Sequence, residues 1–171
     1  MTPWLPLVLD VPDFPEPGIL FKDIAPVLGD GAAFAAVVHG LADACRALGA
    51  EVVVGIEARG FILAAPVAVE LGAGFVPVRK PGKLPRATHS VAYGLEYGQG
   101  TLHLHTDALR PGQRVVVVDD VLATGGTLAG AADLVARCGA TLAGAVVLLE
   151  IEGLGGRARL GELPVTALAA V

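Results

Sequence analysis

Four consecutive valines at 115–118 constrain the fold of this chain more than any other feature of its sequence. An uninterrupted run of β-branched residues is typical of a strand whose two faces are both covered by helices. Two carboxylates, Asp119 and Asp120, follow the run directly, and a loop rich in glycine and threonine then leads into a helical pattern from Leu128. The segment predicts a central strand with a polar loop at its carboxyl end.

Helical and strand patterns alternate along much of the remaining chain. Each expected helix ends at a glycine, and the expected helices are 31–48 after the cap Asp30, 62–71 and 128–138. The expected strands are 51–55, 75–78 and 141–150. This order predicts an α/β fold with a mostly parallel central sheet flanked by helices, and with ligands at the carboxyl ends of the strands.

The segment 90–105 has a different pattern. Apolar and polar residues alternate there around Gly98 and Gly100. Alternation interrupted by glycine predicts an antiparallel hairpin that stands apart from the main sheet.

Length and composition predict one globular domain over residues 1–171. Independent cores need roughly 100 to 200 residues each, and no linker or repeat divides the chain. Hydrophobic residues make up 54% of the chain, which excludes intrinsic disorder. The mean hydropathy of +0.66 raises the question of a membrane span, but Pro66, Glu70 and Pro77 interrupt the most apolar stretch, 60–78. Residues 1–10 carry no Lys or Arg, so they predict no secretion signal.

Charge and cysteine usage exclude further classes. The net charge of -5 argues against nucleic acids and anionic membrane surfaces as partners. Cys45 and Cys138 belong to no CxxC or Cys/His pattern, which predicts buried, reduced thiols and a cytoplasmic protein. The spacing of His103 and His105 fits one face of a strand and predicts no metal site.

The loop after the valine strand has the composition of a phosphate site. Amides at the start of the following helix are unpaired, and Gly125 and Gly126 allow a ligand to approach them closely. Thr124 and Thr127 add hydroxyl donors. The two carboxylates before the loop can accept hydrogen bonds from a ribose diol, directly or through Mg²⁺ and its waters. The sequence therefore predicts a site for a sugar phosphate.

Other interpretations of this loop are weaker. The chain has no GxxxxGK motif followed by Ser or Thr, which argues against a P-loop NTPase, and no GxGxxG after a strand, which argues against a dinucleotide site. In a purely structural interpretation the glycines turn the chain and the carboxylates cap the helix. That interpretation is disfavoured because adjacent carboxylates repel each other unless a cation or a hydroxyl group accompanies them.

The segment 115–127 resembles the phosphoribosyl diphosphate signature of type I phosphoribosyltransferases. Four further segments are similar to motifs of adenine phosphoribosyltransferases, namely 14–23, 57–61, 78–85 and 95–98. They stand in the order of that family, and the likeness extends from about Phe14 to Arg157. Each motif alone is weak evidence, but five in register make chance similarity implausible.

The resemblance implies a fold and an activity. It implies the type I phosphoribosyltransferase fold, in which 1–30 contribute a small hood and 90–105 a flexible lid. It also implies transfer of the 5-phosphoribosyl group from phosphoribosyl diphosphate to adenine, giving AMP and diphosphate, by a homodimer. Mg²⁺ would be bound with phosphoribosyl diphosphate and not in a dedicated protein cage. Asp119 and Asp120 would bind ribose and magnesium, and the residues expected to bind the 5′-phosphate are Ala123, Thr124, Gly125, Gly126 and Thr127.

The lysines support a local cationic site in this acidic chain. Lys22, Lys80 and Lys83 are the only three lysines, and all of them fall within the motifs. Lys80 and Lys83 form a local cationic patch with Arg59 and Arg79, which suits a multiply charged anion. The resemblance implies that Arg59, Lys80 and Lys83 hold the diphosphate and that the Arg79 position often reaches across a dimer interface. The alternative is a biased codon usage that left three lysines by accident.

For the base, the resemblance implies that the backbone at Leu20 and Phe21 reads the adenine edge, with Lys22 nearby and Ile151 on a ring face. Phe21 and Ile151 could instead be ordinary core residues. The lid would carry Glu96 and Tyr97 as catalytic residues, Glu96 for charge support or proton handling and Tyr97 for closure. Alternatively, Glu96 and Tyr97 form an exposed strand pair.

The chain departs from the usual pattern of the family at two positions, and two alternative functions stay open. Ala25 stands where many relatives carry Thr, and His103 stands where an acidic residue is frequent. One alternative function is a phosphoribosyltransferase for xanthine, hypoxanthine or guanine, against which the 14–23 motif argues. The other is a regulator that binds phosphoribosyl diphosphate without turnover, for which the chain lacks both a DNA-binding domain and a basic helix.

Overall fold

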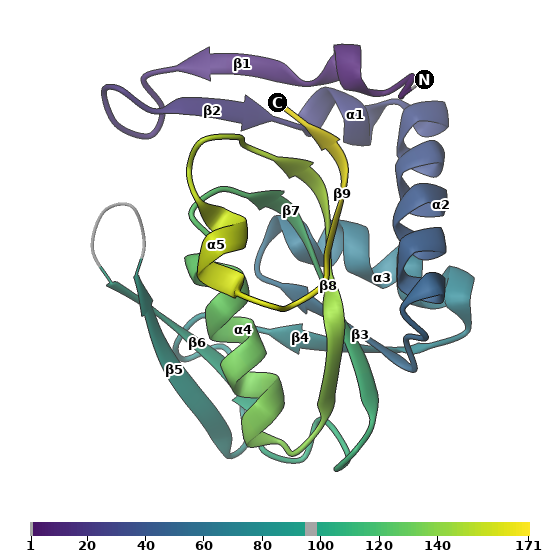
Figure 1. Ribbon diagram of the computed structural model, residues 1–171, viewed down its shortest axis with the longest axis vertical. Helices are drawn as coiled ribbons and strands as arrows, with labels where there is room; N and C mark the ends of the chain where they lie inside the picture. Colours follow the sequence, from purple (N-terminus) through teal and green to yellow (C-terminus); the bar gives the residue numbers. More distant parts are fainter. Residues whose placement is uncertain (1, 95–98) are drawn as a thin grey trace.

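A five-stranded parallel sheet forms the centre of the computed structural model, which describes residues 2–94 and 99–171 (Figure 1). The strands lie in the order β4-β3-β7-β8-β9 and all neighbours are parallel. Their bounds are β3 Val52–Ile56, β4 Gly74–Val78, β7 Arg114–Leu122, β8 Thr141–Glu150 and β9 Val165–Ala170. The predicted α/β fold with a mostly parallel sheet is confirmed, and the valine run lies in the central strand.

Helices cover both faces of this sheet. The helices α2 (Gly31–Ala47) and α3 (Arg59–Leu71) pack on one face, and α4 (Gly126–Arg137) packs on the other. Successive side chains of a strand point to opposite faces. Val116 and Val118 accordingly belong to the cluster with α2 and α3, whereas Val115 and Val117 belong to the cluster with α4. Burial on both faces explains the uninterrupted valine run.

The predicted antiparallel hairpin is present beside α4, apart from the main sheet (Figure 1). It consists of β5 (Thr88–Gly94) and β6 (Gln99–His105), which pair from Thr88 with His105 to Gly94 with Gln99. Val91, Leu102 and Leu104 anchor it in the apolar cluster that includes α4. Glu96 and Tyr97, the predicted catalytic pair, lie outside the described residues.

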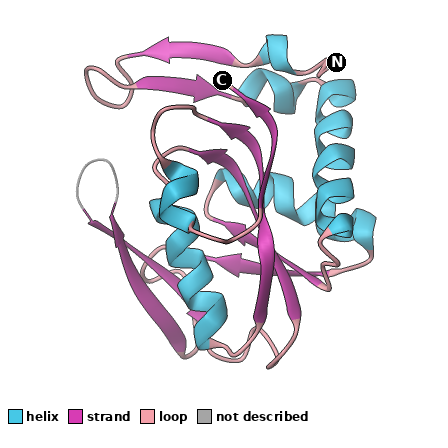
Figure 2. Cartoon of the chain, in the orientation of Figure 1, coloured by secondary structure: helices cyan, strands magenta, loops and turns pink. Residues whose placement is uncertain are grey.

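Residues 2–30 lie across the carboxyl ends of the sheet strands (Figures 1 and 2). They form a 3₁₀ helix Leu5–Leu7, the antiparallel strands β1 (Leu9–Pro12) and β2 (Leu20–Asp23), and helix α1 (Ala25–Gly29). Trp4, Ile24 and Val27 are buried in the same cluster as α2. These three side chains fix the β1–β2 hairpin above the sheet.

Several boundaries differ from the sequence-based expectation. Helix α3 begins at Arg59 and not at Ile62, and β7 continues to Leu122, so both carboxylates after the valines are strand residues. Helix α5 (Gly156–Leu160) and strand β9 were not predicted. Five residues are too few for a helical period, and β9 is an edge strand without a fully buried side chain.

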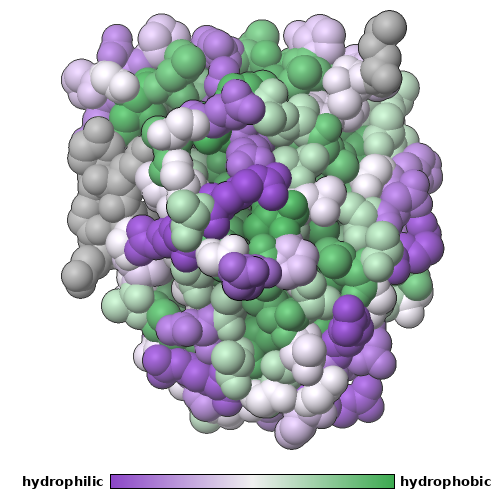
Figure 3. Space-filling model, viewed as in Figure 1, coloured by the Kyte–Doolittle hydropathy of each residue, from purple (hydrophilic) through white to green (hydrophobic). Residues whose placement is uncertain are grey.

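The large apolar fraction of the chain is accounted for by two core clusters, one on each face of the sheet. On the face shown in Figure 3, hydrophilic and hydrophobic residues are interspersed. Among residues 2–94 and 99–171, no helix combines the length and the hydropathy needed to cross a membrane.

Both cysteines are buried and free, as expected. Burial raises the pKa of Cys45 to about 12, and the thiolate is the reactive form of cysteine. We expect alkylation of Cys45 by iodoacetamide at pH 8.5 to be roughly a thousandfold slower in the native protein than in urea. Mass spectrometry of timed samples measures both rates, and equal rates would contradict the burial.

Candidate functional site

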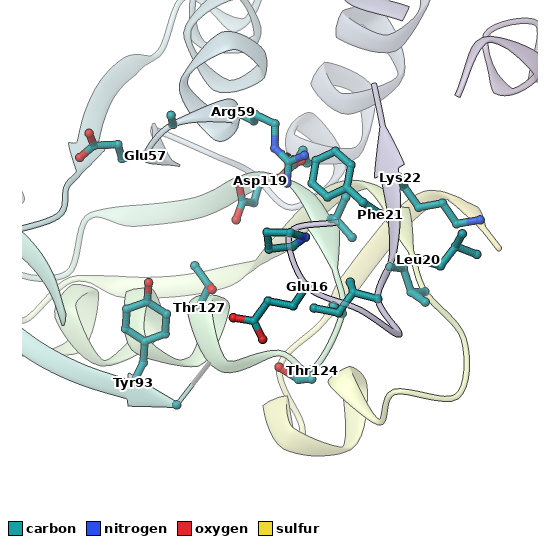
Figure 4. Close-up of a pocket in the computed structure, with 18 of the residues that line it drawn as sticks. Glu16, Leu20, Phe21, Lys22, Glu57, Arg59, Tyr93, Asp119, Thr124 and Thr127 are labelled. Carbon is teal, nitrogen blue, oxygen red and sulfur yellow. Dashed lines mark ion pairs between the residues drawn. The ribbon is translucent and has the colours of Figure 1, made fainter. Parts of the chain in front are cut away.

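A cavity of about 640 Å³ opens at the carboxyl ends of the strands, beneath the β1–β2 hairpin (Figure 4). In a parallel sheet this edge is where ligands bind. The predicted site residues that line the cavity are Leu20, Phe21, Lys22, Arg59, Lys80, Asp119, Asp120, Ala123, Thr124, Thr127 and Ile151. Those that do not line it are Arg79, Lys83, Gly125 and Gly126. The structure thus brings residues predicted to bind the 5′-phosphate, the ribose and Mg²⁺, the diphosphate and adenine into one cavity.

The paired carboxylates lie at the floor of this cavity. Asp119 is 8% exposed and Asp120 is 5% exposed. Burial raises the pKa of both carboxyl groups, and the neighbouring Asp120 raises that of Asp119 further, while Arg59 opposes the rise at Asp120. A Cβ atom at Gly60 would lie 2.6 Å from Asp119 Oδ1, so this close approach to α3 requires glycine.

Arg59 connects the floor of the cavity to the N-terminal hairpin. Its Nε atom lies 2.7 Å from Asp120 Oδ2, and its guanidinium carbon lies 4.8 Å from the centroid of the Phe21 ring. The Arg59–Asp120 contact is an ion pair by distance, but its angles do not make a hydrogen bond. Asp120 Oδ2 is consequently buried without a hydrogen-bond partner among the described residues.

Two neighbouring carboxylates, with Asp120 Oδ2 paired to the Arg59 guanidinium but accepting no hydrogen bond, form a donor set that fits Mg²⁺, which prefers oxygen ligands and retains several waters. Within 2–94 and 99–171 no group of three or more acidic, His or Cys side chains is arranged to hold a metal ion. Asp119 and Asp120 would therefore supply at most part of a coordination shell, with substrate oxygens and water as the other ligands.

The phosphate loop connects β7 to α4. Gly125 occupies the position before the helix with φ 78°, a conformation that favours glycine. Ala123, Thr124 and Thr127 line the cavity, and Figure 4 shows the two threonines apart from Leu20, Phe21 and Lys22 of β2. Gly126 instead packs against the Gly94 carbonyl oxygen and lines a smaller neighbouring cavity. The loop therefore offers the free amides of a helix start beside two hydroxyls.

The basic segment 79–83 follows β4. Lys80 lines the cavity, whereas Arg79 forms an ion pair with Glu57, with Nη2 3.3 Å from Oε1. Glu57 also lines the cavity, and the sequence-based assignment of site residues did not include it. The backbone amide of Lys80 lowers the pKa of Glu57, and the Arg79 guanidinium lowers it further against the opposing effect of burial.

Three of the base-binding candidates, Leu20, Phe21 and Lys22, belong to β2, and the fourth, Ile151, follows β8. Phe21 and Ile151 are half-buried and belong to neither core cluster, so the interpretation of both as ordinary core residues was wrong. The ammonium group of Lys22 donates a hydrogen bond of 2.7 Å to Asp10. Glu16, another lining residue, was also missed, because nothing in the sequence indicates that the turn of the hairpin faces the sheet.

Comparison with known proteins identifies the family. The phosphoribosyl transferase domain matches residues 28–162. An adenine phosphoribosyltransferase of Nocardioides sp. is 57% identical and is aligned over 98% of this chain and 92% of its own length. The chain belongs to the adenine phosphoribosyltransferase family.

Solved structures of this family agree in fold. An adenine phosphoribosyltransferase from Thermoanaerobacter pseudethanolicus is 47% identical, with a TM-score of 0.94 over 96% of both chains. The Saccharomyces cerevisiae adenine phosphoribosyltransferase, solved with an imino-altritol bisphosphate and adenine, is 34% identical, with a TM-score of 0.85 over 95% of this chain and 93% of its own. The type I phosphoribosyltransferase fold is confirmed.

Proposed function

We propose that the chain transfers the 5-phosphoribosyl group of phosphoribosyl diphosphate to adenine, giving AMP and diphosphate in purine salvage. One observation carries the proposal: the paired carboxylates, the phosphate loop, Lys80 and the β2 segment surround one cavity of about 640 Å³. A ring nitrogen of adenine bonds to the anomeric carbon and releases its proton. The bond from that carbon to the diphosphate oxygen breaks, and the diphosphate takes the electron pair.

We assign binding of the ribose and the 5′-phosphate to β7 and the loop after it. Asp119 and Asp120 would accept hydrogen bonds from the ribose hydroxyls, and the amides and hydroxyls of 123–127 would hold the phosphate. Holding the sugar at both ends orients the anomeric carbon toward the base. Bound Mg²⁺ would neutralise charge on the diphosphate at these carboxylates.

The leaving group needs positive charge close to its oxygens. Lys80 lines the cavity, and Lys83 belongs to the same segment. Arg59 would change partner from Asp120 to the diphosphate as the substrate binds. Charge developing on the leaving group is then stabilised by groups that are already in place.

Adenine would lie between the hairpin and Ile151. The backbone amide and carbonyl groups at Leu20 and Phe21 would pair with adenine's ring acceptor and amino donor, which oxopurines do not match. Glu96 and Tyr97 remain our candidates for charge support at the anomeric carbon and for closure over the substrates.

We also propose a cytoplasmic homodimer. Both cysteines are free thiols, in keeping with a reducing compartment. Ile62 and Val69, which share one face of α3, and Phe75 on the edge strand β4 are exposed apolar side chains that a partner could cover. In such a dimer Arg79 would lie near the interface.

Assaying diphosphate release with adenine, hypoxanthine, guanine and xanthine tests the activity. We expect kcat/KM for adenine to exceed that for each oxopurine by about a hundredfold or more, because a mismatched base leaves backbone groups unpaired. An oxopurine as the best substrate would contradict the specificity. Binding of phosphoribosyl diphosphate without release of diphosphate, whatever the base, would instead favour the regulator.

A further inference from the structure

Glu57 places a negative charge beside a site proposed for a polyanion. It follows β3 directly, lines the cavity, and has a side chain that is only 15% exposed. A carboxylate close to a bound diphosphate repels it, so a charge effect alone makes Glu57 unfavourable there. In Figure 4 its carboxylate points away from Arg59 and Asp119.

The side-chain hydrogen bonds of Glu57 lead to the segment 79–83. Oε2 accepts a hydrogen bond of 2.9 Å from the Lys80 amide and one of 3.3 Å from Arg79 Nε, and Oε1 accepts one of 3.3 Å from Arg79 Nη2. Arg79 Nη1 in turn donates to the Lys83 carbonyl oxygen at 3.3 Å. Both carboxylate oxygens are thus engaged by donors of this segment.

The main chain of Glu57 is also hydrogen-bonded to β4, the strand that leads into this segment. The Glu57 amide donates to the Val78 carbonyl oxygen at 3.0 Å, which joins the end of β3 to the end of β4. The Arg79 guanidinium carbon lies 5.8 Å from the centroid of the Phe61 ring on α3. Glu57 and Arg79 together hold the segment from its first residue, Arg79, to its last, Lys83.

We propose that Glu57 is a positioning residue that holds the segment 79–83 in the shape that directs Lys80 into the diphosphate site. This inference rests on the proposed function. Glu57 acts through the Lys80 amide and Arg79 and touches neither substrate. The benefit of the ordered lysine segment outweighs the repulsion between its carboxylate and the diphosphate.

Positioning and simple charge predict opposite signs for the same substitution. If Glu57 positions the segment, Glu57→Ala weakens the binding of inorganic diphosphate by about tenfold, the effect of losing a charged hydrogen-bond network. Glu57→Gln keeps an acceptor for the Lys80 amide and is expected to lose about threefold. If Glu57 contributes only its charge, both variants bind diphosphate more tightly than the wild type.

Titration calorimetry of the full chain with diphosphate and Mg²⁺, and separately with adenine, measures these effects. We expect the adenine Kd to stay within about twofold in both variants, because the hairpin side of the cavity is not attached to Glu57. In the activity assay, KM for phosphoribosyl diphosphate should rise in both variants, and more in Glu57→Ala than in Glu57→Gln. Unchanged or tighter diphosphate binding in both variants would overturn the inference.

Glu51 provides a matched control. Glu51 lies just before β3, at the end of the strand away from the cavity. Its Oε2 accepts a hydrogen bond of 2.7 Å from the amide of Arg114. Glu51→Ala removes a similar carboxylate-to-amide contact, so it should lower thermal stability while diphosphate affinity is unchanged. If Glu57→Ala does not fold, the Gln variant carries the test, with adenine binding as its measure of folding. Failure of the wild type to bind diphosphate or convert adenine would count against the proposed function instead.

Discussion

Replacing Asp119 with asparagine is expected to lower kcat/KM by about a hundredfold to a thousandfold while making the ligand-free protein more stable. The two effects share one cause. Asp119 is buried next to a second carboxylate, and burial together with the Asp120 charge raises its pKa. A raised carboxyl pKa means that the ionised form costs folding free energy. In the complex, the bound ribose and cation would offset that cost. Asparagine is uncharged, so the Asp119→Asn variant lacks the cost even when no ligand is bound.

Two measurements separate these effects. The unfolding temperature in EDTA should rise in Asp119→Asn by about 2–4 °C for each kcal/mol of relieved repulsion. Adding Mg²⁺ and phosphoribosyl diphosphate should then raise it much more in the wild type than in the variant. Asp43→Asn, an exposed carboxylate paired with Arg46 on α2, is the control and should change neither activity nor ligand stabilisation. A variant that loses stability while keeping wild-type turnover would contradict the assignment of Asp119.

The valine strand and the phosphate loop could be predicted because their signals are local. Four β-branched residues followed by two carboxylates and paired glycines specify both the burial of β7 and the chemistry at its end. Glu57 could not be predicted in the same way. Its role depends on β4 returning beside β3, which brings Arg79 and Lys80 to a residue more than twenty positions earlier in the chain.

The partners of Arg59 were missed for the same reason. The sequence indicates a cation for the diphosphate, but the structure places Arg59 between Asp120 and the ring of Phe21, from three separate segments. Such contacts follow from how the strand ends meet at one edge of the sheet. Local patterns identify which residues have useful chemistry, and the topology sets which of them share partners.

The second large effect is expected at Gly156, where α5 packs backbone to backbone against the phosphate loop. A Cβ atom there would lie well inside contact distance of the Ala123 carbonyl oxygen and 2.6 Å from Leu122 Cδ1. A backbone carbonyl group cannot rotate away as a side chain can, so alanine must displace the loop by about 1 Å. Displacements of that size near reacting groups cost about a hundredfold in rate, and we expect this loss in kcat/KM for Gly156→Ala.

Gly155→Ala separates loop displacement from backbone strain. Gly155 has φ 71° with no atom within 4 Å of a Cβ atom, so alanine there adds strain alone, about 1–2 kcal/mol. Gly156 has no positive φ and starts a helix, where alanine is otherwise favourable. Calorimetry with AMP should therefore show a large loss of affinity for Gly156→Ala and a small change for Gly155→Ala. Equal losses in the two variants would mean that mobility of α5, and not contact with the Ala123 carbonyl, controls the phosphate loop.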